Sequence, residues 1–162
     1  MFTKIYELFI SFFGNNLADY LYGAVCSENG EKTFEGSNQY NMYGFIALGI
    51  SFAIAAIFYF LNHPNFNKKR HWFLMLLLVA VSNFFIGGGM TLSDLSSGNI
   101  GACLLSGENG GIYAMNCWMF GLANFFVSAI FFIIISVVIF NLLIGRFTIH
   151  NTCNTPIPFH KK

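Results

Sequence analysis

Eighteen uncharged residues in a row, GFIALGISFAIAAIFYFL from Gly44 to Leu61, decide the class of this fold. An α-helix rises about 1.5 Å per residue, so about 20 apolar residues cross a hydrocarbon core that is about 30 Å thick. Pro64 follows this stretch after two polar residues, and proline cannot continue a helix. The pattern therefore predicts a slightly short transmembrane helix over residues 44–61.

Two further uncharged stretches have the same character. The first, WFLMLLLVAVSNFFIGGGMTL, runs from Trp72 to Leu92 and has the length of one membrane crossing. The second runs from Cys117 to Gly145, and its 29 residues are more than one perpendicular crossing needs. We therefore expect transmembrane helices over residues 72–92 and 117–145, the last one tilted or extending beyond the lipid.

The composition of the whole chain agrees with a membrane protein. Of its 162 residues, 56% are hydrophobic and only 9% are charged, whereas a soluble domain carries about 25% charged residues. The net charge of +1 gives no electrostatic footprint for nucleic acid. We therefore expect an all-α, integral membrane helical bundle that forms one membrane domain over residues 1–162. Its partner is the lipid bilayer, with no nucleic-acid partner through bulk charge.

The first 25 residues are harder to assign. Residues 5–25 have the length of a span but contain Glu7, Asn15 and Asp19, so this segment either crosses the membrane or lies in its interface. With four spans, seven of the eight basic residues fall in the cytoplasmic amino terminus, loop 62–71 or tail 146–162. Five acidic residues then fall in the outer loops, 26–43 and 93–116. The positive-inside rule thus favours four spans in a cell (inner) membrane with both termini cytoplasmic, whereas three spans would place the amino terminus outside.

A polar stripe runs along the expected first helix. Glu7, Ser11, Asn15 and Asp19 are each four residues apart, a spacing that places them on one face of a helix. An ionisable group at membrane depth costs about 2.5 to 3.5 kcal/mol on insertion scales, so these side chains must face water or other helices. We expect them to line a pore; a helix lying on the membrane surface and a buried packing stripe are the alternatives.

Small and amide side chains at helical spacing predict where helices pack. The small faces consist of Ala47, Ser51 and Ala55 in one helix and of Gly121, Asn124 and Ser128 in the last helix. Such faces let two backbones approach closely, either within one chain or between copies in a homo-oligomer. We also expect the amides of Asn83, Asn124 and Asn141 to form hydrogen bonds across helices.

Three cysteines map to the expected outer side, and Cys153 maps to the tail. In an oxidising compartment two of the three could pair, and a bond between Cys103 and Cys117 would close a loop over 13 residues; free, buried cysteines are the alternative. Four spans with a cysteine pair in the second loop resemble the membrane quinone oxidoreductases that regenerate disulfide catalysts. That family needs C-x-x-C in the first outer loop, where Cys26 stands alone, so we do not assign the chain to it.

Other chemistry has little support in the sequence. His150, Cys153 and His160 are irregularly spaced and would make only a weak zinc site, so we expect no metal and no cofactor. G-x-S-x-G, H-E-x-x-H and a phosphate-cradling glycine loop are absent from the sequence. We therefore expect no catalytic residues and no enzyme activity.

These observations lead to two functional hypotheses from different classes. The first is an oligomeric ion channel or pore, with the polar stripe as its wall and acidic loops that favour cations at its mouth. Membrane-depolarising effectors of bacterial toxin or phage-defence systems would be a setting for such a protein. The second hypothesis is a non-catalytic subunit or anchor of a larger membrane complex, which would use the small-residue faces to contact other membrane subunits.

Overall fold

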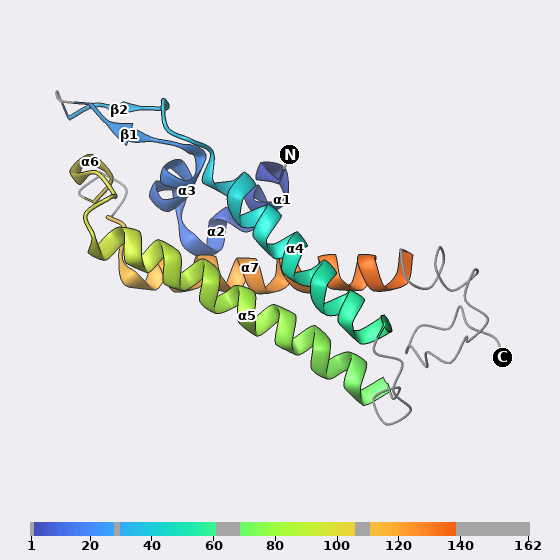
Figure 1. The fold of residues 1–162 in the computed structure, drawn as a ribbon. Helices are drawn as coiled ribbons and strands as arrows, with labels where there is room; N and C mark the ends of the chain where they lie inside the picture. Colours follow the sequence, from blue (N-terminus) through green and yellow to red (C-terminus); the bar gives the residue numbers. More distant parts are fainter. Residues whose placement is uncertain (1, 28–29, 61–68, 106–110, 139–162) are drawn as a thin grey trace.

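The structure is a computed structural model that describes residues 2–27, 30–60, 69–105 and 111–138. The described chain is mostly helical, with one short hairpin. The elements are α1 (Thr3–Glu7), α2 (Ile10–Phe13), α3 (Asn15–Tyr22), β1 (Val25–Cys26), β2 (Lys32–Thr33), α4 (Gln39–Phe60), α5 (Lys69–Ser96), α6 (Ala102–Leu105) and α7 (Ala114–Ile134). Figure 1 shows α4, α5 and α7 as a three-helix bundle, with the shorter elements gathered toward one end.

Three helices are long and apolar enough to cross a membrane, over Gln39–Tyr59, Arg70–Ser96 and Ala114–Val138. They contain the whole of the predicted stretch 72–92 and the described parts of the other two up to Tyr59 and Val138, and each begins a few residues earlier than predicted. The last span includes a π-helical stretch over residues 135–138. The predicted end of that helix and the tail 146–162 lie outside the described residues.

The amino-terminal segment is not the single helix predicted over residues 5–25. It consists of α1, α2 and α3, which are too short to cross a membrane individually. Gly14 separates α2 from α3 with φ +87°, and Gly23 ends α3 with φ +109°, conformations that side-chain-bearing residues rarely adopt. The described residues therefore contain three membrane-length helices instead of four, and the β1–β2 hairpin also departs from the predicted all-α fold. We call residues 2–38, which hold α1–α3, β1 and β2, the cap.

Glycines allow α5 and α7 to approach closely. A Cβ atom added at Gly121 would lie 2.7 Å from the Phe84 carbonyl oxygen and 3.1 Å from the Gly88 nitrogen. A Cβ at Gly87 would lie 2.9 Å from the Asn124 side chain, and one at Gly88 would lie 2.7 Å from the Trp118 ring. The close contact between α5 and α7 thus depends on glycine at these positions, as is common where membrane helices pack.

Both predicted small-residue faces are buried against other helices of the same chain, where Ser51 of α4 meets Ser128 of α7 and Gly121 of α7 meets α5. Ala47, Ser51 and Ala55 on α4 are fully buried, as are Asn124 and Ser128 on α7. The Ser51 hydroxyl lies 2.6 Å from its own helix's Ala47 carbonyl oxygen and 3.2 Å from the Ser128 carbonyl oxygen. The prediction that these faces pack helices is confirmed. Their burial inside the chain, however, removes the reason to expect self-association through the α4 face.

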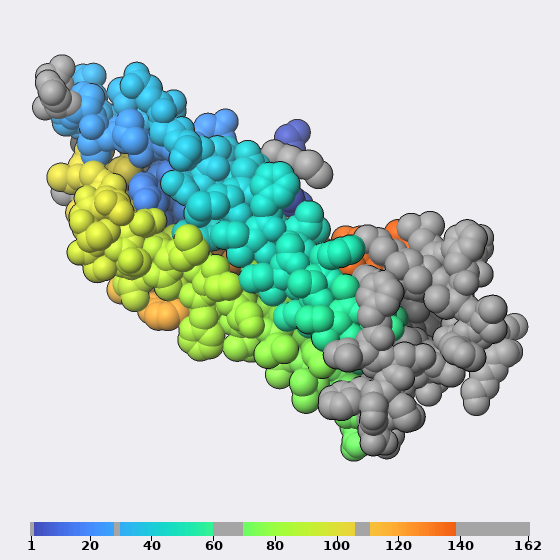
Figure 2. Space-filling view, in the orientation of Figure 1, coloured from blue at the N-terminus to red at the C-terminus, as the bar shows by residue number. Residues whose placement is uncertain are grey.

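Large apolar side chains cover the outside of the bundle. On α5 the exposed ones include Phe73, Leu74, Leu77, Leu78 and Phe85, each about half exposed. Figure 2 shows α4 and α5 side by side on one face, where they form much of the surface of the long part of the molecule. An apolar exterior over polar interior contacts is the arrangement that a hydrocarbon solvent favours.

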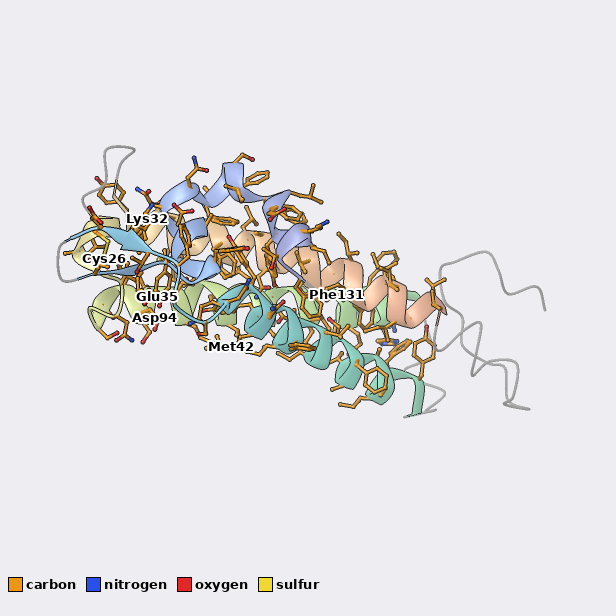
Figure 3. The ribbon with its side chains drawn as sticks, turned by 90° about the horizontal axis from the view of Figure 1, so that it is seen from above. Cys26, Lys32, Glu35, Met42, Asp94 and Phe131 are labelled. Atoms are coloured by element: carbon orange, nitrogen blue, oxygen red, sulfur yellow. A yellow bond between two sulfur atoms is a disulfide. The ribbon has the colours of Figure 1, made fainter. Side chains whose placement is uncertain are left out.

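A disulfide joins the cap to the segment between α5 and α7. It links Cys26 at the end of β1 to Cys103 in α6, while Cys117 is free and buried. The predicted bond between Cys103 and Cys117 is therefore wrong. Cys117 sits in the α7 helix with no exposed surface, whereas Cys26 and Cys103 are brought together by the packing of α6 on the cap. Figure 3 shows Cys26 at the same end of the molecule as Lys32, Glu35 and Asp94, with Phe131 farther along the bundle.

Candidate functional site

Tyr6 anchors the cap in the bundle. Its side chain is fully buried, and its ring stacks on Tyr40 of α4 with the ring centres 5.4 Å apart. Its hydroxyl donates a hydrogen bond of 2.5 Å to Oδ1 of Asn124 on α7. Nδ2 of Asn124 donates in turn to the Asn83 carbonyl oxygen on α5, at 3.0 Å. A series of two hydrogen bonds therefore connects the cap to two long helices. It confirms the prediction that Asn124 forms hydrogen bonds between helices.

Aromatic rings fill the space between the cap and the bundle. Phe120 of α7 is fully buried and packs against rings of the cap and of α4, with centre distances of 5.0 to 6.4 Å. The Asn116 amide donates to the Phe13 carbonyl oxygen at 2.8 Å. Phe2 packs on Gly44, where a Cβ atom would overlap its ring. The cap is thus seated against α4 and α7 by side chains that come from all three regions.

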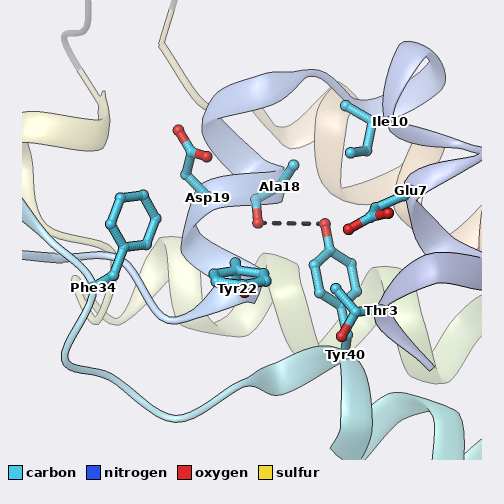
Figure 4. Close-up of a pocket in the computed structure, with 8 residues that line it drawn as sticks. All are labelled: Thr3, Glu7, Ile10, Ala18, Asp19, Tyr22, Phe34 and Tyr40. Atoms are coloured by element: carbon cyan, nitrogen blue, oxygen red, sulfur yellow. Dashed lines mark hydrogen bonds between the residues drawn. The ribbon is translucent and has the colours of Figure 1, made fainter. Parts of the chain in front are cut away.

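A pocket of about 320 Å³ lies between the cap and the start of α4. Two carboxylates and three aromatic rings are among the eight residues that line it. These are Thr3, Glu7, Ile10, Ala18, Asp19, Tyr22, Phe34 and Tyr40. The Tyr40 hydroxyl donates to the Ala18 carbonyl oxygen at 3.3 Å. Figure 4 shows Glu7 and Asp19 on opposite sides of this hydrogen bond, with Tyr22 and Phe34 on the Asp19 side.

The two carboxylates of the pocket have different partners. Oδ2 of Asp19 forms an ion pair of 2.6 Å with Nζ of Lys32, and about a third of each side chain is exposed. An ion pair with this exposure contributes about 0 to 1 kcal/mol to stability. Glu7 is exposed and has no ion-pair partner among the residues that the structure describes. Glu7 is therefore the carboxylate left to attract a cation from solution.

The predicted pore-lining stripe is divided by the structure. Glu7 and Asp19 line the pocket, but Ser11 and Asn15 are exposed and lie outside its lining. The four side chains belong to three different helices, so the four-residue spacing no longer defines one face. The continuous polar wall that the spacing predicted is therefore absent from the described part of the chain.

A second polar contact at the cap joins α3 to the end of α5. The pKa of Tyr20 is raised to about 12, mainly because the phenol is partly buried and also because Asp94 is negatively charged. The Tyr20 hydroxyl is hydrogen-bonded to Asp94. This pair could not be predicted from the sequence, because Tyr20 and Asp94 are far apart in the chain and neither belongs to a motif. The contact holds α3 on α5 as long as the phenol stays protonated.

The interior of the bundle is polar at several points. Six polar side chains are fully buried there; they are Ser51, Asn83, Thr91, Asn124, Ser128 and Ser136. At the end away from the cap, the Trp72 indole donates to Oγ of Ser136 at 2.7 Å, and the Tyr59 hydroxyl lies 2.6 Å from the same atom. Ser136 thus joins all three long helices. Nδ2 of Asn83 donates to Val79 of its own helix at 2.9 Å, instead of reaching across helices as predicted.

The described residues hold no group of three or more His, Cys, Asp or Glu side chains placed to bind a metal ion. His150, Cys153 and His160, the weak zinc candidates, lie outside the described residues, as does Asn141. Comparison with protein-family models, with curated proteins and with solved structures finds no match for this chain.

Proposed function

We propose that the chain is an integral protein of the cell membrane with three spans, and that its cap lies on the outer side. In the sequence, six of the eight basic residues come just before or in the first turn of α5, or after α7, at positions 68–70, 146, 161 and 162. All five acidic residues that the structure describes, Glu7, Asp19, Glu31, Glu35 and Asp94, lie in the cap or at the adjoining end of α5. The positive-inside rule places the basic end in the cytoplasm. A disulfide at the acidic end agrees with an oxidising outer compartment.

Cysteine labelling of intact cells tests this orientation. In a chain in which Ser replaces Cys153, we expect Glu35→Cys to react with a membrane-impermeant maleimide in intact cells. Lys162→Cys should react only after permeabilisation. The opposite pattern would show that the cap lies in the cytoplasm and the carboxyl-terminal tail outside. Labelling of Glu35→Cys but not of Lys4→Cys in intact cells would favour the four-span arrangement with both termini in the cytoplasm, because only that arrangement separates these two residues.

We further propose that the protein is a non-catalytic membrane subunit that acts by binding a ligand in the cap. The observation that carries this proposal is the pocket, in which two carboxylates and three aromatic rings from separate elements converge. Concave sites with apolar walls and a few polar groups are where proteins bind small molecules. The bundle beneath is joined by its own polar side chains, so it serves as a support that holds the cap at the membrane. Titration with candidate ligands, described below, tests this function.

An oligomeric cation channel is the second candidate, and the exposed acidic cap favours it. Several copies would place Glu7 and the other carboxylates around a common mouth, where they would concentrate cations. Purified protein in liposomes should then conduct K⁺, and Glu7→Gln should lower the conductance. A native mass measurement would give the number of copies. Absence of flux from a correctly inserted protein would reject the channel and leave the binding subunit.

A further inference from the structure

We propose that the pocket in the cap binds an ammonium group carried on an organic molecule or on a lipid headgroup. This inference rests on the proposed binding function and names the class of its ligand. Aromatic faces attract organic cations, and a nearby carboxylate supplies the opposite charge. Tyr22, Phe34 and Tyr40 provide the rings, and Glu7 provides a carboxylate without an ion-pair partner among the described residues.

Lys32 already pairs an ammonium group with one of the two carboxylates that line the pocket. Its side chain ends in a primary alkylammonium, which lies 2.6 Å from Oδ2 of Asp19. Phe34, two residues along the chain, lines the pocket, and its ring packs edge-on against Tyr22 with the ring centres 6.0 Å apart. An ammonium group from another molecule would meet the Glu7 carboxylate and Tyr40 on one side of the pocket, and Tyr22 and Phe34 across it.

The lining favours an organic cation over a metal ion. Calcium takes six to eight oxygen ligands and magnesium requires a near-ideal octahedron. The two carboxylates here lie on opposite sides of the Tyr40 to Ala18 hydrogen bond, and the remaining wall is largely aromatic or aliphatic. A volume of about 320 Å³ is at the small end of ligand sites, which suits a compact ammonium head with a short substituent.

The position of the cap makes a lipid headgroup one source of the ammonium. Tyr6 of α1 bonds to Asn124, ten residues after the start of α7, so the cap descends alongside the outer part of a membrane-length helix. Leu8 and Phe12 on the cap are 77% and 53% exposed, as expected for side chains that dip into lipid. The pocket is therefore within reach of an ethanolamine or choline headgroup, as well as of a free organic cation.

The test uses the full chain in phosphatidylglycerol nanodiscs, which contain no ammonium lipid. Choline chloride is titrated at constant ionic strength against sodium chloride, with binding followed by saturation-transfer NMR. We expect saturable binding of choline. Glu7→Gln should weaken it about tenfold, and Phe34→Leu, which keeps an apolar side chain but removes the ring, should weaken it about two- to fivefold. Glu35→Gln is the matched control, because Glu35 is an exposed cap carboxylate outside the pocket lining, and it should leave the affinity unchanged.

Binding of 3,3-dimethylbutanol, an uncharged isostere of choline, tests the ammonium proposal separately from the proposed binding function. If it binds as tightly as choline, the ammonium proposal is overturned while a binding pocket stands. If neither compound binds, the proposed binding function fails as well. Equal weakening by Glu7→Gln and Glu35→Gln would show attraction to bulk negative charge and would also overturn the proposal.

A second set of nanodiscs distinguishes the two sources of the ammonium group. Phosphatidylethanolamine added to the phosphatidylglycerol should lower the apparent choline affinity if the headgroup reaches the pocket. An unchanged choline affinity would support a free organic cation. Glu7→Gln should abolish the competition in the first case, because lipid and choline would then share the same carboxylate.

Discussion

In the three-helix bundle small residues let the helices approach closely, whereas the cap is seated on the bundle by large aromatic side chains. Gly121 meets the α5 backbone, and Ser51 meets the α7 backbone. The cap is held instead by the rings of Tyr6 and Tyr40 around Phe120. The bundle is thus specified by a pattern along each helix, and the cap by side chains that reach across elements. The two regions should therefore respond to different substitutions.

The largest effect should come from removing the disulfide. Replacing Cys26 and Cys103 by Ser opens a link between residues 77 positions apart, which the loop-closure account values at about 4.5 kcal/mol. We expect amide hydrogen exchange in the cap to accelerate by a factor of roughly 100 or more, while amides of α5 and α7 keep their protection. Equal acceleration in both regions would show that cap and bundle unfold as one unit, and the comparison would not hold.

A smaller loss is expected when one methyl group is added between α5 and α7. Gly121→Ala places a Cβ against backbone atoms that cannot rotate away, which should cost about 1–3 kcal/mol. Gly89→Ala is the matched control, because a Cβ there meets nothing within 4 Å and alanine favours the helix. Unfolding in SDS, followed by the fluorescence of Trp72 and Trp118, should distinguish the variants. Similar unfolding curves would argue against a close contact at Gly121.

Tyr6→Phe should loosen the cap by about 1–2 kcal/mol. The substitution keeps the ring between Tyr40 and Phe120 but leaves Oδ1 of Asn124 buried without its donor. Hydrogen exchange should increase in α1 before it increases in α5. Tyr22→Phe serves as a control, since the Tyr22 side chain is half exposed. A Tyr6→Phe protein with unchanged exchange would mean that ring packing alone anchors the cap.

The smallest effect concerns pH. The folded-state pKa of Tyr20 is raised to about 12 from an ordinary value of 10.0, so its contribution to stability is complete below pH 10 and is lost as the pH rises toward 12. Thermal unfolding of the wild type should therefore show a decline in stability over this range, and Tyr20→Phe should reduce the decline. The contribution would be disproved by a Tyr20→Phe protein whose stability falls with pH as steeply as that of the wild type.

The long helices could be predicted from the sequence because uncharged length is a local property. The predicted starts at residues 44, 72 and 117 lie three to five residues inside the observed starts, at 39, 69 and 114. The difference has a simple reason. An apolar stretch marks what lipid can surround, whereas backbone hydrogen bonding continues into the polar turns QYNMY and KRH at the helix ends.

The cap could not be predicted in the same way. The four-residue spacing from Glu7 to Asp19 fitted one helix, but Gly14 adopts a conformation that interrupts it. Three outer cysteines allow three pairings, and sequence separation does not choose among them. Glu7 and Asp19 were identified as functional candidates, and both line the pocket. The aromatic rings beside them come from α3, the turn after β2 and α4, so only the folded chain brings them together.

The bond between Cys26 and Cys103 also bears on how such a protein is made. The covalent ring that it closes contains the whole of α4 and α5, while α1–α3 and α7 lie outside it. In the proposed topology both sulfur atoms reach the oxidising side only after α5 has carried the chain back across the bilayer. In this topology the disulfide therefore forms only after insertion of the α4–α5 hairpin is complete. In that topology a nascent chain whose second span has stalled cannot form this bond, because Cys103 has not reached the outer side.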